Sequence, residues 1–475
     1  MRWPRLYAPQ PIIEERGDDF FIPPYPKPLT HDLGLIEIVL RAHRSLLAVW
    51  PQKYYRSCID EFRILRRQVV VVNTPEHVRY VMVTRNANFE RKSPQMRRAL
   101  APLLGDGLFI SDGETWKRRR PLIADVIHKR RMKEFAPTMT QVAEATVKRW
   151  DAIGPDREIV MLSEMATLTA EIISRTVFGS ALGAEAASRV IEGFTAYQQG
   201  VDSFNLGYFL GADEGWPIVL GRGRKRAIDM VHGVVDEVVR AHMEGAGEAG
   251  SLLDLMIRRK LGEGSDALDA AALRNEAATI FMAGHETTAT ALTWAWYLLA
   301  NAPWAEKRLL EEIQSVCGDA PIGLEQVGQL KWCRAVIMET LRLYPPVPLL
   351  PRQAREADQI GDVSVQKGAL IIISPWLLQR AEDLWEQPNH FAPERFMEGK
   401  QVNPFAYIPF AVGPRICAGL NFGLDESILC LATLARRFRV EPQTGYRADP
   451  FCHLTLRPAG GVPARLIPRT ARANH

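Results

Sequence analysis

The stretch that decides the fold is Phe410-Ala-Val-Gly413-Pro-Arg415-Ile-Cys417-Ala-Gly419, near the end of this 475-residue chain. It closes a region rich in Pro, Asn and Gly, residues 381–416, and leads into an apolar pattern with helical spacing that runs to about Arg437. A thiol held where a helix begins lies close to amide N–H groups and to the positive end of the helix dipole, which favour the thiolate. Because the thiolate is the metal-binding form of cysteine, the stretch predicts that Cys417 is a metal ligand.

The other fixed positions of the stretch suit the same chemistry. Gly413 lets the backbone turn and pass close under a flat macrocycle, and Gly419 leaves room for such a ring. Phe410 can pack against the sulfur and exclude water, while Arg415 can reach an anionic propionate. The alternative is that Cys417 is a buried small apolar residue, which is what most free cysteines are.

The stretch resembles the haem-binding loop of the cytochrome P-450 monooxygenases, F-x-x-G-x-R-x-C-x-G, and every fixed position is filled. The resemblance implies a haem b whose iron is bound by Cys417, in the arrangement where the thiolate favours O–O cleavage. Further motifs of the family follow in order along nearly the whole chain. The implied fold is mainly α, one domain over residues 1–475 with small β-sheets, and with haem between a long central helix, 268–300, and the ligand loop, 410–419. Residues 1–60 would form an N-terminal strap and helix.

Residues 268–300 are apolar almost all round, which is typical of a helix buried inside a protein. Polar groups in its middle, Ala283-Gly-His-Glu-Thr-Thr288, are costly there unless they have a role. The Thr287 hydroxyl can bond the carbonyl of Ala283 and distort the helix, which opens a groove beside the iron. The run matches the family's A-G-x-[DE]-T-[TS], which implies that Ala283 and Gly284 lie against the haem. By the same resemblance, Thr287 and Glu286 manage proton delivery to dioxygen. A helix kink with a local polar network is the alternative.

The pair His285-Glu286 invites comparison with the zinc motif H-E-x-x-H. The fifth position is Ala289, so the second ligand is missing, and no zinc site is predicted. We expect His285 to point away from the iron.

Glu339 and Arg342 lie three residues apart and share one helix face. Taken alone, such a pair is usually solvated and contributes little. The resemblance implies that Arg395, in Pro393-Glu-Arg395-Phe, joins the pair and that the trio locks the loop that delivers the cysteine.

Trp116 and Arg120 are four residues apart, on one face of an expected helix. They match the family's W-x-x-x-R, which implies contact with the haem propionates. Arg352, shortly after Pro345-Pro-Val-Pro348, matches a further propionate-binding arginine less specifically. Surface packing of Trp116 on Arg120 is the alternative.

Bulk properties fit an ordinary globular protein, with 47% hydrophobic and 24% charged residues. The net charge of +4 is too small to indicate a nucleic-acid partner. No secretory signal is evident, and no run of about 20 apolar residues predicts a transmembrane anchor. The six cysteines lie far apart, which favours reduced thiols and a cytoplasmic location: Cys58, Cys317, Cys333, Cys417, Cys430 and Cys452.

The activity that the resemblance implies is insertion of one atom of dioxygen into an apolar organic substrate, such as a lipid, terpenoid or steroid. Because no Gly-rich dinucleotide fingerprint follows Cys417, electrons from NAD(P)H are expected through a separate ferredoxin- or flavodoxin-type protein and its reductase. Two alternatives are a peroxide-driven or isomerising haem-thiolate enzyme and a haem sensor without turnover. The acid–alcohol pair Glu286–Thr287 favours dioxygen chemistry.

Position in the family fold assigns the substrate pocket, and aromatic and leucine residues there suggest an apolar substrate. The expected lining is residues 90–108, Phe194–Phe209, Ala289–Thr290, Val347–Leu350 and His453–Leu456.

Two basic clusters suggest a docking face for an acidic redox protein: Trp116-Lys-Arg-Arg-Arg120, and His128-Lys-Arg-Arg131 with Lys133. Helical geometry turns Arg118 outward if Trp116 and Arg120 face the haem, and Lys117 and Arg119 are expected to reach solvent too. A merely solvated helix face is the alternative.

Local patterns predict further elements. A strand is expected over Arg63–Val72, with a helix beginning at Thr74 and Pro75. Other helices are expected over 114–133, 138–151, 160–178, 184–198, 223–243 and 325–344, and short strands at Val363–Val365 and Ala369–Ile373.

Overall fold

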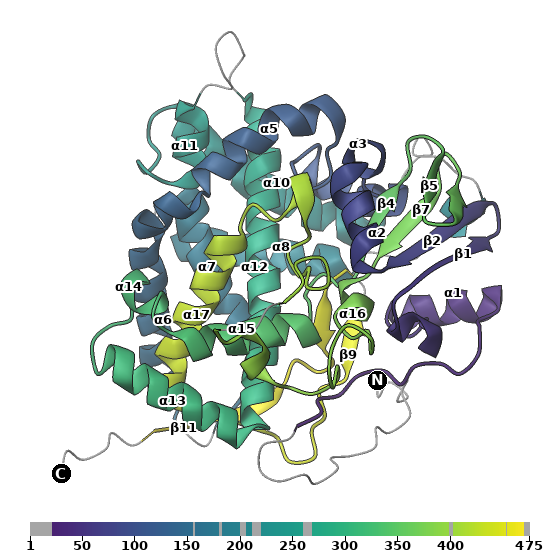
Figure 1. The fold of residues 1–475 in the computed structure, drawn as a ribbon. Helices are drawn as coiled ribbons and strands as arrows, with labels where there is room; N and C mark the ends of the chain where they lie inside the picture. The colour runs from purple at the N-terminus through teal and green to yellow at the C-terminus, as the bar shows by residue number, and fades with distance from the viewer. Residues whose placement is uncertain are drawn as a thin grey trace.

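The computed structural model describes residues 21–154, 157–179, 183–199, 206–210, 220–259, 268–398, 402–452 and 454–469. The fold is mainly helical with small sheets, as the sequence predicts. One long helix, α12 (Ala270–Ala300), runs through the middle of the helical part, and the largest sheet lies to one side of it (Figure 1). Residues 1–20 of the predicted strap lie outside the described residues.

The other helices precede and follow α12 in chain order: α1 Leu35–Arg44, α2 Pro75–Arg79, α3 Asn86–Phe89, α4 Pro94–Leu104, α5 Gly113–Val126, α6 Met132–Ile153, α7 Met161–Phe178, α8 Gly183–Gln199, α9 Leu206–Leu210, α10 Arg222–Met243, α11 Leu252–Arg258, α13 Pro303–Cys317, α14 Leu324–Val327, α15 Lys331–Leu343, α16 Pro375–Leu378 and α17 Leu420–Arg437. Among these helices, α12 included, none combines the length and apolar character that crossing a membrane requires.

The strands form four small sheets: β1 Cys58–Ile64, β2 Arg67–Asn73, β3 Glu158–Val160, β4 Leu350–Gln353, β5 Asp358–Ile360, β6 Val363–Val365, β7 Leu370–Ile373, β8 Phe438–Pro442, β9 Pro450–Cys452, β10 Leu456–Pro458 and β11 Pro463–Pro468. The largest has the order β1-β2-β7-β4. Its only parallel pair within the described residues joins β2 to β7, and Val69–Val72 of β2 are fully buried. This sheet places β4, with Arg352, beside the helical core.

α12 is buried for most of its length, and its first turn is capped by Asp269, whose carboxylate accepts a hydrogen bond from the Ala272 N–H at 2.7 Å. It packs along α7 at close range. A Cβ added at Gly284 would lie 2.8 Å from Cδ1 of Ile173, so this glycine is needed where the two helices approach. The glycine of the central motif therefore serves helix packing in addition to lining the cavity described below.

Several predicted elements have different bounds. The predicted strand 63–72 is a hairpin, β1 and β2, because Leu65 adopts a positive φ of 53° and reverses the chain. The predicted helix 114–133 ends at Val126, and residues 138–151 belong to α6, which begins at Met132. The predicted helix 325–344 is two helices, α14 and α15. The predicted helix start is confirmed, because Thr74 caps α2 by accepting from the His77 N–H at 3.3 Å.

His285 in the middle of α12 should make the protein less stable in acid. Burial lowers the pKa of His285 to about 4, well below its usual value of 6.5. The folded protein therefore keeps this ring neutral. The free energy of unfolding is fully retained above pH 6.5 and falls as the pH drops towards 4, because only the unfolded chain then takes up the proton. Between pH 7.5 and 5.0 the loss is about 2 kcal/mol. We expect His285→Gln to shrink the acid-induced drop in the denaturation midpoint by a corresponding amount. An equal drop in both proteins would contradict this assignment.

Candidate active site

Cys417 lies at the end of a loop that folds tightly on itself. Its backbone N–H donates to the carbonyl of Phe410 at 2.9 Å, and α17 begins at Leu420. Gly413 has a φ of 76°, and an added Cβ would lie 2.3 Å from the carbonyl oxygen of Met82. The glycine therefore allows the loop to approach the segment Tyr80–Thr84. The predicted passage of Gly413 under a macrocycle stays a prediction.

The Cys417 side chain is exposed and lines an inner cavity of about 260 Å³ between the loop and α12. Phe410 and Gly419 line the same cavity on the loop side. Desolvation by the surrounding protein raises the pKa of the Cys417 thiol. This effect is opposed by a hydrogen bond from the backbone of Gly419 and by the positive charges of Arg120 and Lys92. One hydrogen bond and two positive charges thus favour the thiolate. The hydrogen bond from the Gly419 backbone is the kind of amide contact that the sequence predicts at a helix start.

The opposite wall of the inner cavity is the middle of α12. Ala283, Gly284, Thr287 and Thr288 all line it. Ala283 is exposed although most of α12 is buried, because this stretch faces the cavity. The Thr287 hydroxyl donates to the Ala283 carbonyl at 2.6 Å, as expected from the sequence. A hydroxyl and a thiol therefore face one cavity from opposite sides.

Four cationic side chains gather at one part of the same cavity: Lys92, Arg120, Arg352 and Arg415. Burial lowers the pKa of Arg352 to about 9 and of Arg415 to about 10, and it lowers the pKa of Lys92 well below its usual value. Two nitrogens of Arg352, Nε and Nη2, are buried without a hydrogen-bond partner among the described residues. Lys92 falls within the expected pocket stretch 90–108, but it belongs to no motif and was not predicted as a cation of the cofactor site.

Trp116 and Arg120 lie together at the cavity, as their spacing predicts. The Arg415 guanidinium stacks 4.5 Å from the Trp116 ring centroid and donates to the Ser111 carbonyl at 2.8 Å. Arg120 donates to the Ile416 carbonyl at 2.7 Å, which ties α5 to the ligand loop. Arg415 also lies 3.6 Å from a carboxylate oxygen of Glu90. This glutamate, together with the nearby Asp112, neutralises part of the charge of the cluster.

These residues fit a haem. Buried cations with unsatisfied N–H groups require an anionic ligand, because an uncompensated buried charge is costly. A flat apolar molecule with two carboxylates supplies those anions, and the apolar walls suit its ring. In the described part of the chain no group of three or more His, Cys, Asp and Glu side chains could hold a metal ion. A metal bound by Cys417 would thus need ligands from the cofactor itself.

Glu286 does not line the inner cavity, although it is adjacent to Thr287. One oxygen of its buried carboxylate, Oε1, accepts from Nε of Arg457 at 2.7 Å, and Nη2 of Arg457 and the Thr455 hydroxyl bond the same oxygen. Oε2 is buried and has no hydrogen-bond partner among the described residues. Thr455 falls within the expected pocket stretch His453–Leu456, but neither Thr455 nor Arg457 was predicted to bind Glu286, since both lie more than 160 residues further on.

His285 is buried, with its ring 5.8 Å from the Phe281 ring and its backbone carbonyl accepting from Thr169 of α7. It does not line the inner cavity, which agrees with its predicted orientation.

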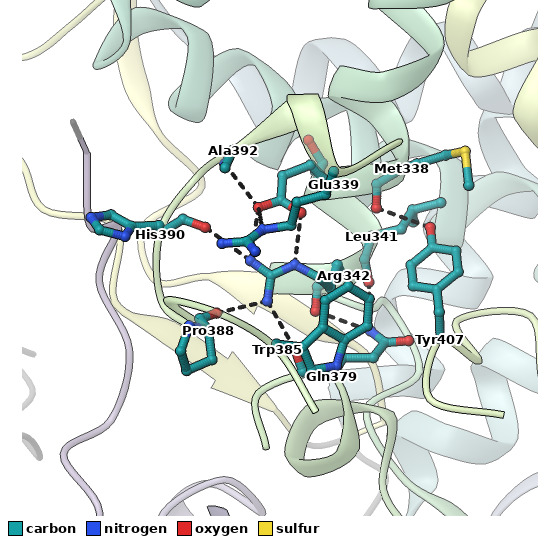
Figure 2. Close-up of polar contacts among 12 residues, drawn as sticks. Met338, Glu339, Leu341, Arg342, Gln379, Trp385, Pro388, His390, Ala392 and Tyr407 are labelled. Carbon is teal, nitrogen blue, oxygen red and sulfur yellow. Dashed lines mark hydrogen bonds and ion pairs between the residues drawn. The ribbon is translucent and has the colours of Figure 1, made fainter. Parts of the chain in front are cut away.

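Glu339 and Arg342 pair in the interior (Figure 2), and the partly buried Arg395 joins them, as the motifs predict. Nε and Nη2 of Arg342 each donate to the Glu339 carboxylate at 2.7 Å, and both side chains are fully buried. Nε of Arg395 lies 3.6 Å from the same carboxylate. The remaining N–H groups of Arg342 donate to three backbone carbonyls, those of Gln379, Pro388 and His390.

That network continues to the ligand loop through Gln379. Its side-chain oxygen accepts from the Ile408 N–H at 2.9 Å, and its side-chain nitrogen donates to the Leu341 and Arg342 carbonyls. Tyr407 donates to the Met338 carbonyl at 2.9 Å (Figure 2). The buried trio thus fixes the chain two residues before Phe410.

A second, outer cavity of about 490 Å³ lies between α1, the β1–β2 hairpin and β4. Predicted pocket residues are divided between the cavities: Leu108, Val347 and Leu350 line the inner one, and Phe209, Leu349 and Leu454 line the outer one. Met96 lines both. Ala289 and Thr290 line neither cavity. Phe194 of α8 also lines neither cavity, because its ring stacks on Phe281 of α12 in the core. Residues 200–205 and His453 lie outside the described residues.

The basic cluster on α5 is only partly outward-facing. Arg118 and Lys117 are exposed, as predicted. The expectation for Arg119 is wrong, because its side chain turns inward and pairs with the buried Glu276 at 3.1 Å and with Asp106 at 2.8 Å.

Glu276 is a further site residue that sequence reasoning missed. It lines the inner cavity, and its carboxylate accepts from the Leu108 N–H at 3.0 Å. Burial raises the pKa of Glu276 to about 7. Together with Arg119 it anchors the segment that carries Leu108 and Phe109 into the cavity wall.

Comparison with known proteins relates the whole chain to one family. The family model described as Cytochrome P450 matches residues 23–461. Cyclooctatin synthase of Streptomyces melanosporofaciens is 30% identical over 444 residues, covering 90% of this chain and 93% of that protein. A cytokinin hydroxylase of Arabidopsis thaliana is 31% identical over 433 residues, covering 88% and 80%. The solved haem domain of cytochrome P450DA has a TM-score of 0.75 at 24% identity, covering 86% of this chain and 90% of that one, and this likeness shows the fold.

Glu339→Gln should destabilise the protein and weaken its hold on haem. The change leaves Arg342 as an uncompensated buried charge, which costs about 3–5 kcal/mol. We expect a lower denaturation midpoint and faster transfer of haem to a scavenging apoprotein. Lys331→Gln is the matched control, because it removes an exposed ion pair with Glu398 at 3.7 Å. Equal haem retention in the two variants would exclude a locking role for the buried trio.

Proposed function

The chain belongs to the cytochrome P450 family, and on that premise we propose that it inserts one atom of dioxygen into an apolar organic substrate, using a haem b held by Cys417. Its relatives are oxidoreductases of monooxygenase type, and one is named as a hydroxylase. The observation that carries the proposal is the inner cavity, in which the Cys417 thiol and the Thr287 hydroxyl face each other across an apolar gap edged by buried cations.

The residues of the inner cavity have separate roles in binding the cofactor. Cys417 would bind the iron, and Arg120, Arg352 and Arg415 would bind the two propionates, together with Lys92. When bound, a thiolate-ligated haem supplies dioxygen activation, because the thiolate favours O–O cleavage. Trp116 and Phe410 would exclude water from the ring edge and from the sulfur.

Protons for the reaction would pass through α12. The Thr287 hydroxyl is bonded to the Ala283 carbonyl, which leaves its oxygen able to accept from a water in the cavity. Glu286 is the neighbouring acid and is buried beside Arg457, whose side chain is partly exposed. We assign Thr287 the role of orienting water at the reacting centre, and Glu286 the role of relaying protons from the solvent side. This acid–alcohol pair favours dioxygen chemistry over a peroxide-driven, isomerising or sensing role.

The substrate class follows from the character of both cavities. Leucine, isoleucine, valine and phenylalanine side chains dominate the walls, and Met96 lies between the two spaces. A lipid, terpenoid or steroid-like molecule suits such walls, because apolar burial drives binding in pockets of this kind. The named relatives act in cyclooctatin synthesis and cytokinin hydroxylation, and these names support a small organic substrate.

Electrons would come from NAD(P)H through a ferredoxin- or flavodoxin-type protein and its reductase. Pro414, three residues before Cys417, is exposed and lines neither cavity, so the loop that carries the thiol has an outer face. Arg118 and Lys117 on α5, and Lys129 and Lys133 after it, are exposed on the same part of the chain. We propose this basic face for an acidic redox partner.

We also propose the cytoplasm as the location, because none of the six cysteines forms a disulfide.

Thr287→Ala should divert electrons from product into hydrogen peroxide. The variant lacks the hydroxyl that orients water, while the cations and thiol that hold the haem are unchanged. We expect product formed per NAD(P)H consumed to fall at least several-fold, with a substrate found by the haem spin-state shift. The control is the reduced carbon monoxide spectrum, whose red-shifted Soret band should persist, whereas Cys417→Ser should lose it. An unchanged product ratio in Thr287→Ala would refute the proton role.

Arg118→Glu should slow reduction of the haem by a ferredoxin-type donor. Attraction between opposite charges steers such encounters, and it weakens as salt rises because the Debye length falls from roughly 10 Å at 0.1 M to about 3 Å at 1 M. We expect the first-electron rate to fall with added salt and to fall further in the variant. Arg465→Glu is the control, because Arg465 is exposed on β11, far from α5 (Figure 1). A first-electron rate that is unchanged both by added salt and by Arg118→Glu would rule out the basic face as the docking site.

A further inference from the structure

We infer that the β9–β10 hairpin controls Glu286: Arg457 and Thr455 are positioning residues for its carboxylate, and Leu454 makes their hold depend on whether the outer cavity is occupied. The inference rests on the proposed role of Glu286 in proton relay. It assigns a function to a segment that no motif of the sequence identified.

The first observation is where the carboxylate of Glu286 lies. Ala283, Thr287 and Thr288 all line the inner cavity, whereas Glu286 does not. Oε1 takes every hydrogen bond that the hairpin provides, from Arg457 and from Thr455. A carboxylate held by charge-assisted bonds keeps its orientation until one of the donors moves. In the structure the acid is therefore held away from the space where its proton would be used.

The two donors are fixed to different degrees by the backbone. β10 is anchored at Leu456, whose N–H donates to the Pro346 carbonyl at 3.0 Å and whose carbonyl accepts from the Trp294 indole at 3.2 Å. Arg457 follows on this strand and pairs with Phe451 in the hairpin register. Thr455 instead belongs to the turn between the strands. Nε of Arg457 also donates to the Thr455 hydroxyl at 3.3 Å, so movement of the turn would withdraw Thr455 from this contact and from Glu286, while the Arg457 backbone stays paired in the strand.

The turn is also part of the wall of the outer cavity. Leu454 lines that cavity, and so does Cys452 at the end of β9. One peptide bond separates Leu454, which faces the outer cavity, from Thr455, which holds the acid. A molecule that displaces Leu454 would draw the Thr455 hydroxyl from Oε1, because the anchored Leu456 leaves the turn as the part able to move.

The consequence is a link between substrate arrival and proton supply. With the outer cavity empty, Glu286 stays bound by both donors. With it filled, the carboxylate keeps Arg457, which is partly exposed and connects it to water, and becomes free to turn towards Thr287. Glu286 would take a proton from the solvent side and pass the same proton to water at Thr287, so it ends each cycle as the carboxylate.

The test uses the haem-loaded enzyme without substrate, supplied with NADPH, a plant-type ferredoxin and its reductase. Dioxygen that receives two electrons and two protons gives hydrogen peroxide, and four of each give two waters. The ratio of peroxide to NADPH oxidised thus reports how readily further protons arrive. Thr455→Val removes the hydroxyl with little change in shape, and Leu454→Trp places bulk where an occupant would lie. We expect both variants to lower the peroxide ratio at least twofold.

Matched variants separate this effect from general damage. Thr455→Ser keeps a hydroxyl and should behave like the parent. Met243→Trp adds the same bulk at an exposed position of α10 that lines neither cavity, and it should leave the ratio unchanged. In a Glu286→Gln background Thr455→Val should have no further effect, since the hydroxyl acts through the acid.

The outcomes also distinguish the two proposals. If Glu286→Gln alone alters neither the peroxide ratio nor the solvent isotope effect on NADPH oxidation, the relay role of Glu286 fails. If Glu286→Gln alters them but Thr455→Val matches the parent, or still acts without Glu286, the relay role stands and control by the hairpin is overturned.

Discussion

The buried ion pair between Glu339 and Arg342 is the interaction on which the site depends. Neither side chain reaches solvent, so each charge has lost its hydration, and that cost is offset only by good geometry and further hydrogen bonds. Arg342 meets the requirement with the carboxylate and three backbone carbonyls, and Glu339 also accepts from the Ala392 N–H. The region 379–408 has little regular structure, and this pair provides much of its hydrogen bonding. The loop with Cys417 begins where that support ends.

The inner cavity shows the opposite electrostatic condition, with several buried cations and few anions. Arg352 has two nitrogens without partners among the described residues, and burial lowers its pKa to about 9. Such a site is unfavourable for the protein alone and favourable once a dianionic ligand is bound. The protein therefore stores binding energy for its cofactor in the desolvation of Arg352 and Lys92. The same reasoning explains why the glutamate at this edge, Glu90, compensates only part of the charge.

α12 is a buried helix that carries polar side chains in its middle, and each of these side chains has different surroundings. His285 is held neutral against α7 and Phe281, and Thr287 bonds the helix backbone while facing the cavity. Glu286 takes its cation from the distant hairpin β9–β10. Each of these residues bonds a different neighbour, while Oε2 of Glu286 and Nε2 of His285 have no hydrogen-bond partner among the described residues. The helix can therefore be continuous through the site and still carry an acid and an alcohol.

The sequence by itself determined the fold class, the central helix and the candidate ligand, Cys417, because these depend on local spacing. The loop 410–419, the run 283–288 and the helical apolar pattern each carry their signal within a few turns of chain. It also identified Glu339, Arg342 and Arg395, through spacing that recurs in a family. Only the tertiary structure decided what these residues touch. Lys92, Glu276, Thr455 and Arg457 belong to no motif, and Arg119 turned inward because a buried carboxylate from α12 lies beneath it. Such partners come from segments far apart in the chain, and local periodicity contains no information about which of them will meet.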